Sequence, residues 1–245
     1  MKKRMKRHIF GLFFILIIST GMANGQAALL VLIFGDKVAT ENFHFSLKLG
    51  ATYSMIHGYE EGTNGWSLNF GLVNNIRIGD RLWLTPEFLP LAVRSIKDVP
   101  VLTTGNADLD DLLVELESTD RRLNYIDIPV LLKADLTRRI SLSAGPQLSV
   151  LLNATDVYKS SPIQEAVLTT ELDISSALRT LDIGGVIDLH IKLVEPVGGK
   201  GVNLFLRYGQ GFRSILKDKS GPRYTSSVFQ FGATFPFVAH SEEPE

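Results

Sequence analysis

The chain has 245 residues, a net charge of −1 and no cysteine. The near-neutral charge and the lack of any nucleic-acid-binding motif argue against a nucleic-acid partner. The absence of cysteine excludes disulfide bonds, thiolate nucleophiles and cysteine-ligated zinc. The length suits one barrel-sized domain or two small ones, and we favour one.

Residues 1–27 have the organisation of a secretory signal peptide. Five basic side chains among the first seven residues precede a mostly apolar run over 9–18, and small and polar residues follow. Cleavage after Ala23 and cleavage after Ala27 both satisfy the small-residue rule. The alternative is an uncleaved anchor helix, although this run falls short of the ~20 residues that span a bilayer. Residues 28–41 would then form an N-terminal periplasmic segment.

Downstream, apolar and polar side chains alternate in eight segments. In the first, the odd positions from 43 to 53 are apolar and the intervening ones are small or polar. This period of two is typical of a β-strand with one apolar face. The third segment is the least regular because it contains Pro86 and Pro90, and its parity points Trp83 inward. The predicted strands span 42–57, 66–78, 81–94, 124–135, 140–152, 178–194, 202–213 and 224–237.

The connections between these segments are alternately long and short. Long ones follow the first, third, fifth and seventh strands, at 58–65, 95–123, 153–177 and 214–223. This asymmetry is typical of outer-membrane barrels with short periplasmic turns and longer external loops. The sequence therefore predicts an all-β fold, an eight-stranded antiparallel up-and-down transmembrane β-barrel over 42–237. A periplasmic tail, 238–245, would follow the aromatic Phe237, although such barrels often finish on an aromatic residue.

Alternation alone does not say whether the apolar face meets lipid or lines a ligand cavity in a soluble barrel. Three features favour lipid outside. Most strands extend over the ~9–11 residues that cross a bilayer at a tilt. The polar faces carry charges of both signs. Aromatic residues lie near the predicted strand ends, as interfacial girdles require. They are Phe43, Phe45, Phe235 and Phe237 at one rim, and Tyr53 and Trp66 at the other.

The polar faces define the candidate site, a luminal charge network. Its predicted members are Lys48, Arg77, Glu87, Asp127, Lys133, Asp182, Asp188, His190, Lys192 and Arg207. Side chains nearly fill the interior of an eight-stranded barrel, so we expect a plug or a structural network rather than an open pore. Buried charges are tolerated when they pair, so each carboxylate is expected to have a Lys or Arg partner across the lumen.

Several short motifs resemble the PorT-like outer-membrane β-barrel family of Bacteroidetes. They are YIDIPVLLK at 125–133, SAGPQLS at 143–149, DIGG at 182–185 and LRYG at 206–209. The resemblance extends over 40–237 and implies an eight-stranded barrel. The members of this family are functionally diverse, and PorT itself is associated with protein secretion, so the motifs imply the fold rather than an activity.

No catalytic, cofactor or metal site is predicted. His190 beside Asp188 would suit a base oriented by a carboxylate, but we favour a luminal hydrogen-bond network. Residues 197–201 (VGGKG) lack the flanking residues of a phosphate loop and are interpreted as a turn. Segment 107–120 places leucines at helical spacing among acidic residues, which predicts a short amphipathic helix in an external loop. We favour a solvated loop there over a docking surface or a divalent-cation site.

The function predicted from the sequence is that of a non-enzymatic integral outer-membrane barrel. It would be structural, or act through external loops in binding or in a membrane or secretion assembly. Its partners would be outer-membrane lipid and a protein bound by those loops, with the oligomeric state left open. The alternatives are a soluble secreted barrel that binds an apolar ligand, a narrow pore, and a lipid-modifying enzyme. The enzyme would need His190 or His57 beside both a hydroxyl and a carboxylate.

Overall fold

The computed structural model describes residues 42–58, 63–99, 118–159, 169–197, 200–217 and 223–237. A single 3-10 turn, Ser175–Ala177, accompanies the strands. No helix of the described residues is long and apolar enough to cross a membrane. The strands are β1 (Phe43–His57), β2 (Thr63–Arg77), β3 (Leu82–Lys97), β4 (Ser118–Asp135), β5 (Ile140–Lys159), β6 (Thr169–Asp173), β7 (Leu181–Val197), β8 (Lys200–Gly211) and β9 (Thr225–Phe237).

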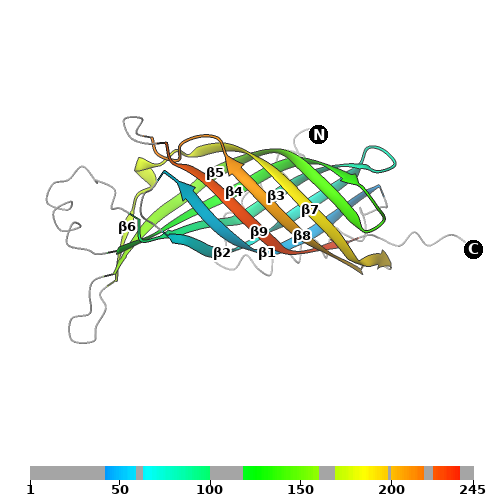
Figure 1. Ribbon diagram of the computed structural model, residues 1–245, viewed down its shortest axis with the longest axis horizontal. Coiled ribbons are helices and arrows are strands. Elements are labelled where there is room, and N and C mark those ends of the chain that lie inside the picture. The colour runs from blue at the N-terminus through cyan, green and yellow to red at the C-terminus, as the bar shows by residue number, and fades with distance from the viewer. Residues whose placement is uncertain are drawn as a thin grey trace, which may run out of the picture.

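Eight of these strands form a closed antiparallel barrel, which confirms the predicted fold. The sheet runs β4-β3-β2-β1-β9-β8-β7-β5, and pairing of β4 with β5 closes the ring. Figure 1 shows the tilted strands of this barrel. The short connections β2–β3, β4–β5 and β7–β8 lie at one end, which we name the turn end. The opposite end is named the loop end.

The ninth strand was not predicted. β6 pairs with residues 155–159 of β5 at the loop end, whereas β7 pairs with residues 140–150 of the same strand. β5 therefore continues beyond the part that β7 covers and offers a free edge, on which β6 forms. This region, and the 3-10 turn after it, fall within 153–177, which the sequence analysis assigned to a connection.

The loop ends of β4 and β5 also extend further than predicted. β4 begins at Ser118 and pairs with β5 up to Lys159. Asp120 lies in β4, so it does not belong to the amphipathic helix predicted over 107–120, and 107–117 lie outside the described residues. The predicted signal peptide, the segment 28–41 and the tail 238–245 also lie outside them.

The barrel wall has an apolar outer face and a largely polar inner face. Half or more of the surface of Trp66, Leu68, Leu132, Leu206 and Phe231 is exposed on the outside. The alternating inward side chains are buried, and many carry charges or hydroxyl groups. The apolar face therefore points away from the lumen, as lipid contact requires. The alternative of a soluble barrel with its apolar face turned inward is wrong.

Aromatic side chains pair at both ends of the wall. At the turn end, the rings of Phe43 and Phe45 lie 5.4 Å apart, edge to face. At the loop end, Tyr53 on β1 lies 4.8 Å from Trp66 on β2, between ring centroids. Aromatic residues at both ends of the wall fit the interfacial girdles of membrane barrels, and Tyr53 and Trp66 add the polar groups that favour an interface.

An irregularity in β3 changes which of its residues face the lumen. Its register against β4 shifts between Leu89 and Ala92, around Pro90. Before the shift the buried positions are odd, and after it they are even. A bulge of this kind inserts an extra residue and reverses the alternation. Trp83 lies before the shift and faces the lumen, as its parity indicated, whereas Arg94 lies after it and faces the lumen because the alternation is reversed.

Candidate functional site

The candidate site is the interior of the barrel, where charged side chains from distant strands meet. A central layer joins Lys48 on β1, Glu87 on β3, Asp188 on β7 and Arg207 on β8, all nearly inaccessible to solvent. The Lys48 Nζ atom lies 3.2 Å from Glu87 Oε2 and 3.5 Å from Asp188 Oδ2. Arg207 donates to Glu87 Oε1 at 2.8 Å and makes two hydrogen bonds to Asp188. Two cations thus face two anions, and the layer is electrically neutral.

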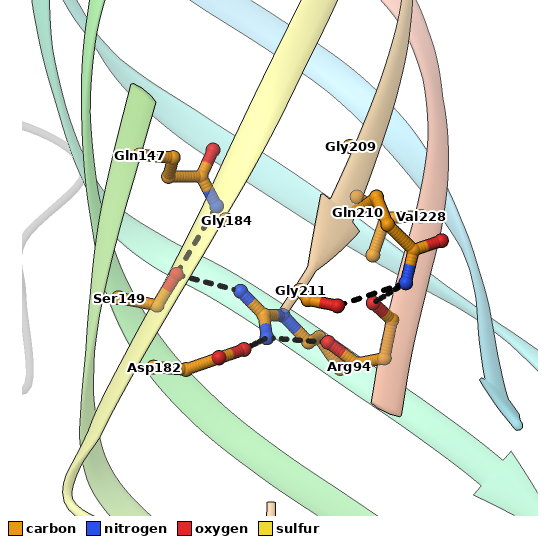
Figure 2. Close-up of a pocket in the computed structure, with 10 residues that line it drawn as sticks. Arg94, Gln147, Ser149, Asp182, Gly184, Gly209, Gln210, Gly211 and Val228 are labelled. Carbon is orange, nitrogen blue, oxygen red and sulfur yellow. Dashed lines mark hydrogen bonds and ion pairs between the residues drawn. The ribbon is translucent and has the colours of Figure 1, made fainter. Parts of the chain in front are cut away.

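A second layer lies nearer the loop end and is organised by Arg94. Its guanidinium lies 3.0 Å from Asp127 Oδ1 and 3.4 Å from Asp182 Oδ2. It also donates to the Ser149 and Ser226 hydroxyl groups, both at 2.8 Å. Figure 2 shows Arg94 reaching across the lumen toward Ser149 and Asp182. One side chain from β3 thus connects four other strands, β4, β5, β7 and β9.

The space left beside Arg94 is small. A void of about 10 Å³ is lined by Arg94, Gln147, Asp182 and Gln210 among others. A void of this size has room for about one water molecule.

The loop-end half of the interior also contains an apolar cluster, which the prediction of a polar lumen did not include. Leu89, Leu123, Leu178 and Ile215 are at most 1% exposed and belong to one buried cluster. Leu178 precedes β7 and forms an isolated bridge with Leu216, which follows β8. Two connections at the loop end therefore fold together and place their apolar side chains against the inward residues of β3 and β4.

At the turn end, the lumen ends in a mouth formed by Trp83, Lys133, Asp135 and Lys192, which we name the turn-end mouth. The Trp83 Nε1 atom donates to Asp135 Oδ2 at 3.0 Å, and Lys133 donates to Asn75 Oδ1 at 2.8 Å. The Lys192 ammonium lies 3.9 Å from Asp135 Oδ2, and its side chain is 31% exposed. The charged side chains of this mouth are more exposed to solvent, and their ion pair is longer, than those of the two buried layers.

The structure thus brings six of the predicted residues into the two buried layers and two more, Lys133 and Lys192, into the turn-end mouth. Each of the four predicted carboxylates has a Lys or Arg partner. Arg77 is different, because it is exposed and donates to the carbonyl oxygens of Gly79 and Asp80 in the adjacent turn. It caps a turn and does not join the buried layers.

The sequence analysis did not predict three charged residues that lie in the interior. Arg94 was missed because the bulge in β3 reverses its parity. Arg121 and Asp156 were assigned to connections, yet both lie in strands, are fully buried and make two hydrogen bonds of 2.7 Å to each other. The sequence signal that could have indicated this pair is the opposite charge of the two residues, which lie just beyond the predicted ends of two neighbouring strands.

His190 does have a hydroxyl and a carboxylate nearby, as the enzyme alternative required. However, the Ser143 hydroxyl at 3.2 Å and Asp188 Oδ2 at 3.5 Å both approach the same atom, His190 Nε2. A Ser-His-Asp relay uses the two different ring nitrogens for these partners. This geometry fits a hydrogen-bond network rather than an activated nucleophile.

The other histidine named for an enzyme, His57, lacks the third partner. Its Nε2 atom lies 2.8 Å from the Ser227 hydroxyl, and no carboxylate contacts it among the described residues. Within the same ranges of the chain, no three His, Asp or Glu side chains gather in a way that could bind a metal ion.

Several solved structures are similar to this barrel. The barrel is similar to Ail, the attachment invasion locus protein of Yersinia pestis, with 10% identity, a TM-score of 0.40, and coverage of 80% of this chain and 97% of that one. Neisserial surface protein A gives 11% identity, a TM-score of 0.43, and coverage of 80% and 98%. The outer membrane protein OprG from Pseudomonas aeruginosa has 12% identity and a TM-score of 0.40, with coverage of 82% of this chain and 99% of that one. No curated protein matches.

The family assignment comes from the sequence of the barrel itself. The family described as "Outer membrane protein beta-barrel domain" matches residues 27–217, which is more than half of the chain. The closed barrel, its apolar outer face and its charged interior are what such a domain requires in lipid. The chain therefore belongs to the outer membrane protein beta-barrel domain family and lies in the outer membrane.

Proposed function

We propose that this protein is a non-enzymatic barrel that conducts no solutes and acts through its loop end. The observation that carries this proposal is the filled interior. The neutral central layer, the Arg94 layer and the apolar cluster occupy the lumen, and a void beside Arg94 has room for about one water molecule. A barrel of eight strands has little room left once such side chains occupy it.

The loop end offers the surface for specific contacts. β4 and β5 continue there beyond the segments that were predicted to cross the membrane, and β6 adds a strand. Exposed charged side chains of both signs, including Arg122, Glu171 and Asp173, lie on this extension. Such a polar, rigid extension is suited to binding another protein outside the membrane.

Conductance in a planar lipid bilayer tests the closed interior. The purified protein is expected to insert without producing current steps, while an open porin inserted under the same conditions gives them. Stable, reproducible current steps from the folded protein would overturn the proposal of a closed barrel.

Site-specific photo-cross-linking in intact cells tests the role of the loop end. A photoreactive residue at Glu171 on β6 is expected to give a cross-link to another protein. The matched control is Leu206, which is 55% exposed on the outer face of β8 and therefore faces lipid. Equal protein cross-linking from both positions, or none from Glu171, Asp173 and Arg122, would argue against a loop-end binding role.

The non-enzymatic part of the proposal is tested on vesicles that carry acyl-labelled phospholipid. We expect no release of fatty acid and no acyl transfer, because Ser143 and Asp188 share one nitrogen of His190. Release that disappears in Ser143→Ala would identify an enzyme.

A further inference from the structure

The turns between β2 and β3 and between β4 and β5 lie side by side at the turn end. The Asp135 amide donates to the Arg81 carbonyl oxygen at 2.8 Å, and Leu82 pairs with Ala134 in the adjoining strands. These contacts join the two turns into one continuous edge of the barrel. We name it the turn-end rim, and it comprises residues 77–82 and 136–140.

The exposed charges of this rim are almost all positive. Its exposed cations are Arg77, Arg81, Arg138 and Arg139, and its one exposed acid is Asp80. Arg77 donates to carbonyl oxygens of its own turn. The guanidinium groups of the other three arginines make no hydrogen bond or ion pair with another residue that the structure describes. Within the described part of the chain, these three cations therefore remain available to an anionic ligand.

The neighbouring groups at this end do not cancel the positive charge. The turn-end mouth adds two cations, Lys133 and Lys192, and one carboxylate, Asp135. The β7–β8 connection carries one residue of each sign, Glu195 and Lys200, whose side chains lie outside the described part. Counted over residues 77–82, 133–140 and 192–200, the sequence has seven cations and three carboxylates. This excess of positive charge favours an anionic partner.

Apolar side chains that face lipid adjoin the same arginines. Ile78 and Leu136 are each 55% exposed, and Leu82, which follows Arg81 directly in the chain, is 41% exposed. The apolar outer face meets the acyl chains of the bilayer, so the arginines of the rim lie at the level where the headgroups begin. An arginine can rest its methylene groups on such an apolar surface while its guanidinium group reaches the headgroup layer.

Arginine is the cation best suited to a phosphate ligand, because its planar guanidinium group donates to two oxygens at once. We propose that the turn-end rim binds the phosphate group of an anionic phospholipid from the adjoining leaflet. Arg81, Arg138 and Arg139 hold the phosphate, and the acyl chains lie against Leu82 and Leu136. A free phosphate ion would gain nothing from these two leucines, so the apolar neighbours favour a lipid. The site lies at the opposite end from the proposed loop-end function and does not depend on it.

Fluorescence quenching in vesicles tests the site, since a single cysteine can be placed in a chain that has none. Leu142→Cys, on the outer face of β5 two residues beyond Ile140, carries a bimane label and leaves every proposed contact in place. The vesicles contain one-fifth phosphatidylglycerol and four-fifths phosphatidylcholine. In one preparation the phosphatidylglycerol carries brominated acyl chains, and in the other an equal amount of the phosphatidylcholine carries them.

Bromine on phosphatidylglycerol is expected to quench this label more strongly, as if that lipid were enriched roughly five-fold around it. One Lys or Arg near an anionic lipid surface is worth about 1 kcal/mol, which corresponds to that factor. The same label at Leu68→Cys, 69% exposed on the outer face near the loop end, should be quenched equally by both lipids. Equal quenching at Leu142→Cys would overturn the proposal. A preference of the same size at Leu68→Cys would overturn it too, because the enrichment would not belong to the rim.

Removal of the cations separates the effect of the rim from that of the whole barrel. Arg81→Gln, Arg138→Gln and Arg139→Gln together should abolish the preference for phosphatidylglycerol. The matched control removes three exposed cations from the loop end and should retain the preference, and it consists of Lys97→Gln, Arg122→Gln and Arg213→Gln. Heat-modifiable gel migration shows that both variants are folded. A preference that survives in the first variant, or is lost in the control, would contradict the proposed site.

Inorganic phosphate distinguishes a lipid site from a site for the free anion. Added at constant ionic strength, it should leave the preference for phosphatidylglycerol unchanged, because it has no acyl chains to place on the apolar part of the rim. Loss of the preference would show that the rim takes free phosphate, and the assignment to a lipid would then be wrong.

Discussion

At the scale of single residues, each buried Lys, Arg, Asp or Glu of the described residues has at least one partner of opposite charge. Lys48 and Arg207 face Glu87 and Asp188, and Arg121 faces Asp156. Burying a charge is costly unless a partner and further hydrogen bonds accompany it. The bonds that Arg207 makes to two carboxylates on different strands meet this condition, so the network ties opposite parts of the wall together.

Removing one member of the central layer should therefore be strongly destabilising. Arg207→Met leaves Glu87 and Asp188 to share Lys48, and we expect a loss of about 3–5 kcal/mol in the free energy of unfolding. Urea titration of the protein folded into lipid vesicles measures it. Lys192→Gln is the control, because its partly exposed ion pair with Asp135, at 3.9 Å, should be worth at most about 1 kcal/mol. Similar losses for both variants would contradict a special role of the central layer.

The sequence located most of these residues, and its omissions have physical causes. Alternation of period two places a charge on the inner face only while the register is regular. It therefore found Lys48, Asp188 and Arg207, whose strands are regular at those points, and missed Arg94, which follows the bulge in β3. Which charges touch across the lumen depends on strand tilt and stagger, which no single segment encodes.

At the scale of elements, the strands were predicted best at the turn end. β5 begins at Ile140 as expected, and β4 ends at Asp135 as expected. The loop ends of β4 and β5 were underestimated because the search was for apolar alternation, whereas both strands continue there with polar outward side chains such as Arg122 and Asn153. β6 has only five residues and is stabilised by its pairing with β5, so its own sequence shows no pattern that predicts a strand.

Glycine allows two strands to approach an aromatic ring inside the barrel. Gly50 of β1 pairs with Gly232 of β9, and a Cβ atom at Gly50 would lie 2.8 Å from Phe205 Cζ and 2.7 Å from the Phe231 carbonyl oxygen. The Phe205 ring is buried and lies 4.2 Å from the Lys48 ammonium, so it cannot move freely.

Gly50→Ala is consequently expected to cost about 1–3 kcal/mol of stability, as overpacking does. Gly79→Ala is the matched control in the β2–β3 turn, where the nearest atom to a new Cβ is 3.6 Å away. Phe205→Leu added to Gly50→Ala should recover part of the loss, because it relieves the ring contact and leaves the backbone contact. The same urea titration compares the variants, and equal stability of Gly50→Ala and the unaltered protein would refute the packing argument.

At the scale of the whole molecule, closure leaves no free edge among the eight barrel strands. Every backbone polar group of the wall can then be satisfied by a neighbouring strand, which is the condition for spanning a membrane. The folded protein in dodecyl sulfate is expected to migrate as a compact band that shifts to the position of the unfolded chain on boiling. Recovery in the soluble periplasmic fraction, with no shift, would contradict the membrane barrel.

The orientation of the barrel is set by the difference between its two ends. Short connections characterise the periplasmic side of such barrels, so the turn end should face the periplasm. In a chain without cysteine, Lys217→Cys at the loop end is expected to react with an impermeant maleimide on intact cells. Arg138→Cys in the β4–β5 turn should react only after the outer membrane is permeabilised. The reverse labelling pattern would place the cationic turn-end mouth outside the cell, where it would face external anions instead of the periplasm.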